Sequence, residues 1–251
     1  MATVSARSLP GLPEVRAGDD LAELIVRALA GEQLHDGQVV AIAHKVVSKA
    51  EGAVVELARV SPSERARALA AALGKDARAV QVVLDESAEV LRAERGVLVC
   101  RTPHGFVCAN AGVDASNAPS PGTLVLLPRD PDSSARRIRA RLRELTGRAP
   151  AVLLSDSFGR PWRHGQLDVA VGLAGMQPLD DWRGRSDAAG LQLQATWLAD
   201  ADAAAACAEL ARAKDSREPV AILSGLERYV MPQDGPGAAA LLRAAEEDLF
   251  R

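Results

Sequence analysis

The stretch DGQVVAIAHKVVSKAEG, residues 36–52, contains a turn, an apolar strand and a polar segment in that order. Its run Val39–Ala43 is short, rich in β-branched residues and preceded by Asp36-Gly37, a pattern that predicts a buried strand. Upstream, residues 21–29 are amphipathic and follow the capping-box sequence Asp20-x-x-Glu23, which predicts a helix. A helix followed by a buried strand indicates that the chain mixes both kinds of element.

The rest of the chain continues this alternation. Further helices are expected from an N-cap at Ser61 to a stop at Gly74, from Asp76 onward, from a cap at Asp132 to Gly147, at residues 202–213, and from Pro236. Strands are expected at residues 97–102 after a hairpin turn at 94–96, and at 124–127, 152–154 and 220–223, while residues 168–175 are a Gly-rich segment. The predicted class is α/β with α+β character, in which mixed and antiparallel sheets are flanked by helices. A P-loop or Rossmann fold is disfavoured because neither G-x-x-x-x-G-K-[ST] nor G-x-G-x-x-G occurs.

Composition narrows the functional classes. The 251 residues suffice for a single domain, residues 1–251, or for two intimately packed lobes. We expect a soluble cytoplasmic protein, because no run approaches the roughly 20 apolar residues of a membrane helix and the N-terminus lacks a secretory pattern. Cys100, Cys108 and Cys207 are scattered, which favours buried free thiols. A net charge of −3 gives no overall reason to bind nucleic acid, and the basic run at 136–143 fits a structural helix face.

The densest group of candidate functional residues is SDSFGRPWR, residues 155–163. A short apolar strand would deliver Asp156 and the hydroxyl of Ser157 into a Gly/Pro loop that also carries Arg160 and Arg163. Loops at strand ends hold oxygen ligands well. The alternative is that the Asp and Ser only cap the loop and the arginines are solvated.

Two further polar segments could take part in a site. In residues 110–117, small residues let the backbone approach a ligand while Asp114 and Asn117 offer oxygens, although an ordinary Asx turn is the alternative. After the strand Val39–Ala43, His44, Lys49 and backbone amides stand where a polyphosphate would fit, with plain surface lysines as the alternative. Two separate Asp-bearing turns suit Mg2+ or Mn2+ bridging nucleotide phosphates.

In their order along the chain, these motifs resemble the coenzyme F-420:L-glutamate ligase family. The matching pieces cover most of the chain and lie at residues 12–15, 44–52, 102–106, 109–117, 127–138, 155–166 and 168–175. The resemblance implies a fold of the family's own type, a homodimer, GTP as co-substrate, Mg2+ or Mn2+, and K+ as a further cation. Some members carry a C-terminal nitroreductase-like domain, and this chain is expected to be the stand-alone form.

The resemblance also assigns residues. Those implied to contact GTP are Leu12, Pro13, Glu14, Val15, His44, Lys49 and Asn117, and those implied to hold metal are Asp114, Asp156 and Ser157. Relatives often have Ser at position 44 and Thr at position 157. At positions 213 and 214 they often carry Gly-Gln or Gly-Lys, whereas this chain has Ala213-Lys214, so no ligand is assigned there. We add Arg160 and Arg163 as anchors for the anionic groups of the acceptor.

The implied reaction is GTP-dependent ligation of L-glutamate to the lactyl carboxylate of a deazaflavin coenzyme F-420 precursor, through an acyl phosphate. A second glutamate would then join through its γ-carboxylate. His104 and His164 are candidates for the general base, and Trp162 is expected to be a packing residue rather than a platform for the deazaflavin. The alternatives are another metal-dependent phosphoryl-transfer or amide-forming enzyme with a different carboxylate acceptor, and a non-catalytic nucleotide-binding protein.

Overall fold

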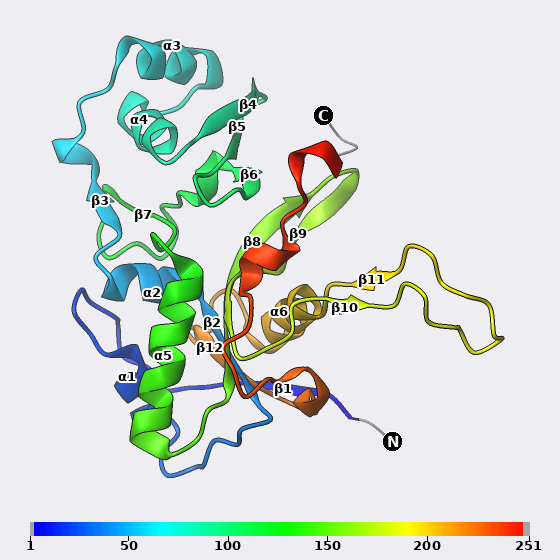
Figure 1. The fold of residues 1–251 in the computed structure, drawn as a ribbon. Coiled ribbons are helices and arrows are strands. Elements are labelled where there is room, and N and C mark those ends of the chain that lie inside the picture. The colour runs from blue at the N-terminus through cyan, green and yellow to red at the C-terminus, as the bar shows by residue number, and fades with distance from the viewer. Residues whose placement is uncertain (1–2, 248–251) are drawn as a thin grey trace.

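A five-stranded mixed sheet forms the centre of the computed structural model, which describes residues 3–247 (Figure 1). Its strand order is β1 (Ser5–Ser8), β12 (Val220–Ser224), β2 (Val39–Ala43), β8 (Ala151–Arg160) and β9 (Arg163–Ala174). Only the β2–β8 pair is parallel within this sheet, and its other neighbours are antiparallel. The fold is therefore mixed α/β and not a Rossmann fold, as the sequence predicted.

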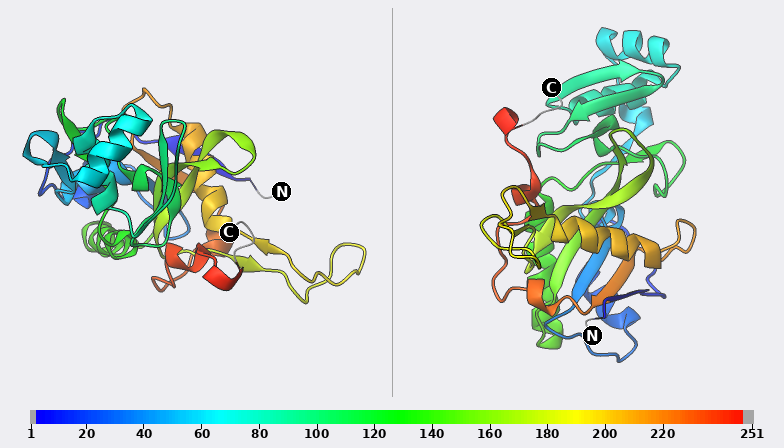
Figure 2. Two further views of the ribbon diagram at one scale, coloured as in Figure 1. Left: turned by 90° about the horizontal axis from the view of Figure 1, so that it is seen from above. Right: turned by 90° about the vertical axis from the view of Figure 1, so that its right-hand side faces the viewer.

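Helices cover both faces of this sheet, as Figures 1 and 2 show. On one face lie α1 (Leu21–Ala28), α2 (His44–Ala50) and α5 (Pro131–Thr146), and on the other lies α6 (Asp200–Ala211). Side chains alternate along a strand, so Val40 and Ile42 of β2 pack in the cluster that includes α1 and α5. Val39 and Ala41 face the alanines of α6 instead. This two-sided burial explains why β2 is continuously apolar.

A third hydrophobic cluster lies apart from the central sheet, at the top of Figure 1. It is built from α3 (Glu64–Leu73), α4 (Ala77–Asp85) and a sheet of β4 (Glu89–Glu94), β5 (Val97–Arg101) and β6 (Val107–Ala109). The pair β3 (Val54–Glu56) and β7 (Thr123–Val125) lies between this region and the central sheet. The predicted hairpin turn joins β4 to β5, where Arg95 and Gly96 have φ of 51° and 77°, as a type I′ turn requires.

The remaining elements lie outside these three clusters. The short strands β10 (Asp180–Asp181) and β11 (Trp197–Leu198) belong to an arm that extends away from the central sheet (Figures 1 and 2). The 3-10 turns are η1 (Leu57–Arg59), η2 (Asn110–Gly112), η3 (Glu227–Tyr229), η4 (Ala238–Leu241) and η5 (Ala245–Glu247). Among residues 3–247 no helix combines the length and apolarity that crossing a membrane requires.

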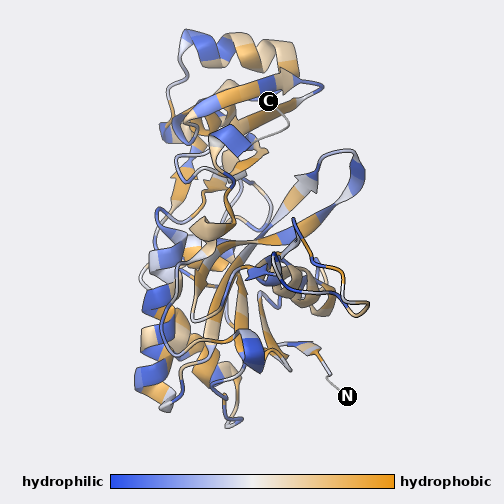
Figure 3. Ribbon diagram, turned by 45° about the vertical axis from the view of Figure 1, so that its right-hand side comes forward, coloured by the Kyte–Doolittle hydropathy of each residue, from blue (hydrophilic) through white to orange (hydrophobic). Residues whose placement is uncertain are grey.

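The basic helix α5 has the structural role that its sequence predicted. In Figure 3 hydrophilic and hydrophobic positions alternate along it. Arg139 is buried and donates to the carbonyls of Pro150 and Met231, at 3.1 and 2.7 Å, and to Asp234. Arg141 is held by Asp20, the N-cap of α1. These arginines tie α5 to its surroundings.

Two predicted helix caps were wrong by two residues. The hydroxyl of Ser63, not Ser61, caps α3 by accepting from the amide of Ala66 at 3.2 Å. Helix α5 is capped by Asp130, whose carboxylate accepts from the amide of Ser133 at 2.9 Å. The carboxylate of Asp132 instead accepts from the amides of Leu173 and Ala238 at 2.8 and 2.7 Å. Asp132 thus serves a long-range contact that a local capping pattern does not reveal.

Two longer segments also differ from the prediction. Residues 155–163 are not a loop after a short strand, because β8 continues to Arg160 and turns at Pro161 and Trp162 into β9. The supposed Gly-rich segment 168–175 lies largely in β9. The backbones of β8 and β9 pair with each other as antiparallel strands. The final helix predicted from Pro236 is absent from the described part of the chain, where η4 and η5 occur instead. Gly237 has φ of 86°, which is incompatible with a helix running through it.

Candidate active site

A pocket of about 830 Å³ opens where β2 reaches its carboxyl end beside the parallel strand β8. Strand β2 stops at Ala43, opposite Ser155, whereas β8 continues to Arg160. The stretch of β8 after Ser155 therefore borders open space where β2 has ended. A pocket of this size suits a nucleotide or another small molecule.

Most of the residues that the sequence singled out meet in this pocket. Its lining includes every candidate for GTP contact and every candidate for metal, namely Leu12, Pro13, Glu14, Val15, His44, Lys49, Asp114, Asn117, Asp156 and Ser157. The two candidate anion anchors, Arg160 and Arg163, do not line it. Arg160 donates to the carbonyl of His164 at 2.7 Å across the β8–β9 turn.

One side of the pocket is formed by α2, which begins as β2 ends. His44 is buried there, with Nδ1 3.3 Å from Ser48 Oγ. Its Nε2 lies 3.3 Å from Asp156 Oδ1, an ion-pair distance, but the geometry does not make a hydrogen bond. Lys49 is also buried and donates from Nζ to Glu14 Oε1 at 2.6 Å. The alternative that Lys49 is a plain surface lysine was therefore wrong.

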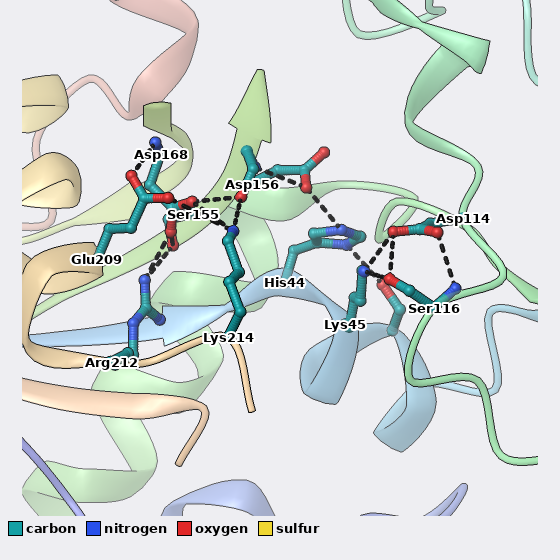
Figure 4. Close-up of polar contacts among 12 residues, drawn as sticks. His44, Lys45, Asp114, Ser116, Ser155, Asp156, Asp168, Glu209, Arg212 and Lys214 are labelled. Carbon is teal, nitrogen blue, oxygen red and sulfur yellow. Dashed lines mark hydrogen bonds and ion pairs between the residues drawn. The ribbon is translucent and has the colours of Figure 1, made fainter. Parts of the chain in front are cut away.

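Asp114 lies on the same side of the pocket, at the end of a turn fixed by a backbone bridge to Val125 (Figure 4). Its carboxylate accepts from the ammonium of Lys45, and from the amide and hydroxyl of Ser116 at 2.8 and 2.7 Å. Burial disfavours its charge, but the hydrogen bonds from Lys45 and Ser116 outweigh burial and lower the pKa of Asp114. The Asx turn, which the sequence offered as the alternative, is present, and Asp114 lines the pocket as well.

The opposite side is formed by the end of α6 and by β9. Asp168 accepts from Ser155 and Ser157 at 2.8 and 2.6 Å, and from Arg212 at 2.7 Å. Its backbone amide donates to Glu209 at 2.9 Å. Burial lowers the pKa of Arg212, against the charges of Asp168 and Glu209. This network joins β8, β9 and α6.

Ser157 also meets a lysine that the sequence left without a role. Lys214 Nζ donates to Ser157 Oγ at 2.6 Å and lies 3.4 Å from Glu209 Oε1. Figure 4 shows Lys214 between the Asp168 group and Asp156. The sequence resemblance to relatives drew attention to position 214 but assigned no ligand there, and the contact of Lys214 with Ser157 joins segments far apart along the chain.

The residues of the pocket fit a metal that arrives with phosphates. Within residues 3–247, no three His, Cys, Asp or Glu side chains are grouped to hold a metal by themselves. Mg2+ and Mn2+ commonly use one or two carboxylates together with phosphate and water. Asp114, Asp156 and the hydroxyl of Ser157 supply such a partial set on the walls of one pocket.

The pocket has more acidic than basic side chains among the described residues that line it, which suits the binding of a cation. Its described lining carries seven acidic side chains and five lysines or arginines. The acidic ones are Glu14, Asp114, Asp156, Asp168, Glu209, Asp215 and Glu218, and the basic ones are Lys45, Lys49, Arg212, Lys214 and Arg217. A polyphosphate would be repelled by this excess of negative charge unless further cations accompanied it.

Several other candidates lie outside the pocket lining. His104 Nε2 lies 3.0 Å from the carbonyl oxygen of Pro128, to which it donates, and the ring stacks on Phe106. His164 is exposed in β9, close to the β8–β9 turn. Trp162, in that turn, is 82% exposed, so the expectation that it packs was wrong. Cys100 and Cys108 are buried free thiols as predicted, whereas Cys207 is half-buried.

Comparison with known proteins places the chain among ligases. The sequence profile of the family described as F420-0:Gamma-glutamyl ligase matches residues 11–225. A Coenzyme F420:L-glutamate ligase of Methanothermobacter thermautotrophicus is 45% identical over 251 residues, with 99% of each chain covered. A protein of the same name from Methanopyrus kandleri is 44% identical over 99% of this chain and 98% of its own. One from Haloarcula marismortui is 40% identical over 97% of this chain and 94% of its own.

Proposed function

The chain belongs to the F420-0:Gamma-glutamyl ligase family, and from this premise we propose that it joins L-glutamate to a carboxylate of a coenzyme F420 precursor with GTP as co-substrate. The observation that carries the proposal is the gathering of all ten candidate nucleotide and metal residues in one pocket. They come from four separate stretches of the sequence. An arrangement of this kind supports phosphoryl transfer better than any single motif does.

The chemistry requires activation of the acceptor. A carboxylate is a poor acyl donor, because attack by an amine would have to expel an oxide. Transfer of the γ-phosphoryl group of GTP to a carboxylate oxygen forms an acyl phosphate and GDP. The amine of glutamate then attacks the acyl carbon, the C–O bond to phosphate breaks, and the amine releases a proton to give the amide and inorganic phosphate.

The chain's own residues would position these groups. Lys49, at the pocket wall, supplies a compact positive charge for a phosphate. Leu12 to Val15 and Asn117 would shape the nucleotide subsite, and Asp114, Asp156 and Ser157 would hold Mg2+ or Mn2+. When bound, such a cation neutralises charge on the transferring phosphate. His104 and His164 lie outside the pocket lining, so neither is carried forward as the general base.

Further parts of the proposal rest on the family. We propose a homodimer acting in the cytoplasm, K+ as an additional cation, and a second glutamate added through the γ-carboxylate. Light scattering at assay concentration tests the dimer, and a monomer alone would contradict it. Product masses test how many glutamates are added.

The central experiment incubates the purified chain with the deazaflavin precursor, L-glutamate, Mn2+ and GTP, and follows products by mass spectrometry. We expect the precursor to gain one or more glutamyl units while GDP and phosphate appear in equal amounts. A parallel reaction with ATP in place of GTP tests which nucleotide is the co-substrate. Turnover with ATP and none with GTP would contradict the proposal that GTP is used. GDP release without a glutamylated precursor would point to another carboxylate acceptor.

A further inference from the structure

Two lysines without an assigned ligand hold two of the three side chains proposed for metal. Lys45 Nζ, from the first turn of α2, donates to Asp114 and to Ser116 Oγ, the latter at 2.6 Å. Lys214 Nζ, from the segment after α6, donates to Ser157 Oγ at 2.6 Å. Figure 4 shows the Lys45 ammonium group beside the oxygens of Asp114 and Ser116. The carboxylate of Asp114 and the hydroxyl of Ser157 therefore each have an ammonium group next to them.

We propose that Lys45 and Lys214 occupy the cation positions of the pocket while nucleotide is absent and move onto nucleotide phosphates when a divalent cation binds. The inference rests on the proposed function of this pocket and adds a consequence to it. Divalent cation and nucleotide should bind as a pair, because the lysines need a new anionic partner before they release Asp114 and Ser157.

Coulomb's law supplies the reason for coupling. Like charges in contact repel each other strongly near a protein surface, and a divalent cation doubles the repulsion that a monovalent cation would cause. A metal at Asp114 would therefore be strongly repelled by the Lys45 ammonium beside it. The same holds for Lys214 at Ser157. Binding of metal alone must displace each ammonium, whereas phosphates give the ammonium groups a favourable place to go.

The side chains are suited to such a movement. Lysine is a point charge on a flexible four-carbon stem, and it contacts phosphate without a fixed geometry. The side chain of Lys214 is 71% exposed, so little packing opposes its displacement. Both lysines line the same pocket as Lys49, which stands on the next turn of α2 after Lys45. New phosphate contacts therefore lie within the same cavity.

The experiment measures Mn2+ binding by electron paramagnetic resonance, first with Mn2+ alone and then with a non-hydrolysable GTP analogue. It compares the wild-type chain with Lys45→Met and Lys214→Met. The control is Lys75→Met, which makes the same change where the ammonium binds Asn110 Oδ1 outside the pocket lining. We expect the analogue to tighten wild-type Mn2+ binding by about tenfold or more, which corresponds to about 1.4 kcal/mol of coupling.

Each lysine variant should bind Mn2+ alone about tenfold more tightly than wild type, and the analogue should help it less. Lys75→Met should behave as wild type. If the wild type binds Mn2+ with the analogue but neither variant binds Mn2+ alone more tightly, the inference is overturned and the proposed metal site stands. If the wild type binds no Mn2+ even with the analogue, both the inference and the proposed metal site are contradicted. Lys45→Gln and Lys214→Gln repeat the test should a Met variant fail to fold.

Discussion

Two basic side chains in the pocket, Arg212 and Lys49, are buried to nearly the same extent but are held in different ways. The side chain of Arg212, at the end of α6, is 7% exposed, and that of Lys49, in α2, is 6% exposed. The carboxylate that pairs with Arg212, Asp168, is 8% exposed, whereas Glu14, which pairs with Lys49, is 68% exposed. The exposure of the lysine or arginine alone therefore does not distinguish the two ion pairs, whereas the exposure of its carboxylate partner does.

The difference lies in how many groups fix each cation. Arg212 donates to Asp168, to Ser155 Oγ and to the carbonyl of Pro219, so it joins β9, β8 and the residue before β12 to the end of α6. Lys49 donates to a carboxylate that water can reach. A fully desolvated pair is costly to break, whereas an ion pair with one exposed partner is weak and easily exchanged. The buried Arg212–Asp168 pair on the α6 side thus acts as a scaffold, whereas Lys49 on the α2 side can exchange its partner for a ligand.

The first prediction removes the scaffold cation. Arg212→Met should lower the free energy of unfolding by about 3–5 kcal/mol, because Asp168 would remain buried without its partner. Urea denaturation followed by circular dichroism measures this loss. Arg143→Met, a change of the same kind at an exposed position of α5, should alter stability by less than about 0.5 kcal/mol. A loss below about 1 kcal/mol for Arg212→Met would erase the distinction between the two sides.

The second prediction tests the carboxylate between the two sides. Asp156→Asn should lower turnover at least about 100-fold, equivalent to about 2.7 kcal/mol, because the amide keeps an oxygen but loses the charge that offsets a cation. Steady-state kinetics with GTP and Mn2+ measure the effect. The free energy of unfolding should change by less than about 1 kcal/mol. Asp114→Asn is expected to follow the same pattern.

The matched control is Asp187→Asn in the β10–β11 arm. Asp187 Oδ1 accepts from the amides of Ala189 and Leu191 at 2.9 and 2.8 Å, which an asparagine oxygen can also do. This variant should retain normal turnover. Normal turnover in Asp156→Asn as well would mean that Asp156 has only a structural role on β8.

The sequence predicted the local part of the fold well. Val39–Ala43 was placed at its observed bounds, because a fully buried strand carries an unbroken apolar run. The β8–β9 hairpin was missed, because Asp156 and Ser157 are polar and gain their strand geometry from cross-strand partners in β9. Asp132 was mistaken for a cap for a similar reason, since its partners Leu173 and Ala238 are distant in sequence.

The site shows the same division between local and long-range information. Motif resemblance identified His44, Lys49, Asp114 and Asp156, and the structure places all four in one pocket. Local patterns gave no sign of the Asp168–Arg212 pair, because a buried Asp and a buried Arg look like any charged residues until their 2.7 Å contact is seen. A carboxylate on β9 and an arginine at the end of α6 can be recognised as a pair only once the helix is packed against the sheet.

The smallest expected effect concerns the partner of Lys49, and it decides whether the two sides of the pocket differ in energy as well as in geometry. Glu14→Gln should lower the free energy of unfolding by less than about 1 kcal/mol, because the glutamate is mostly exposed and solvent screens its charge. The glutamine oxygen can still accept from the ammonium of Lys49. Urea denaturation under the conditions used for Arg212→Met gives the comparison directly, and Glu32→Gln, at an exposed pair with Arg7, serves as the control. A loss above about 2 kcal/mol would place Lys49 in a desolvated site like that of Arg212, and the view that the α2 side exchanges its partners for a ligand would have to be abandoned.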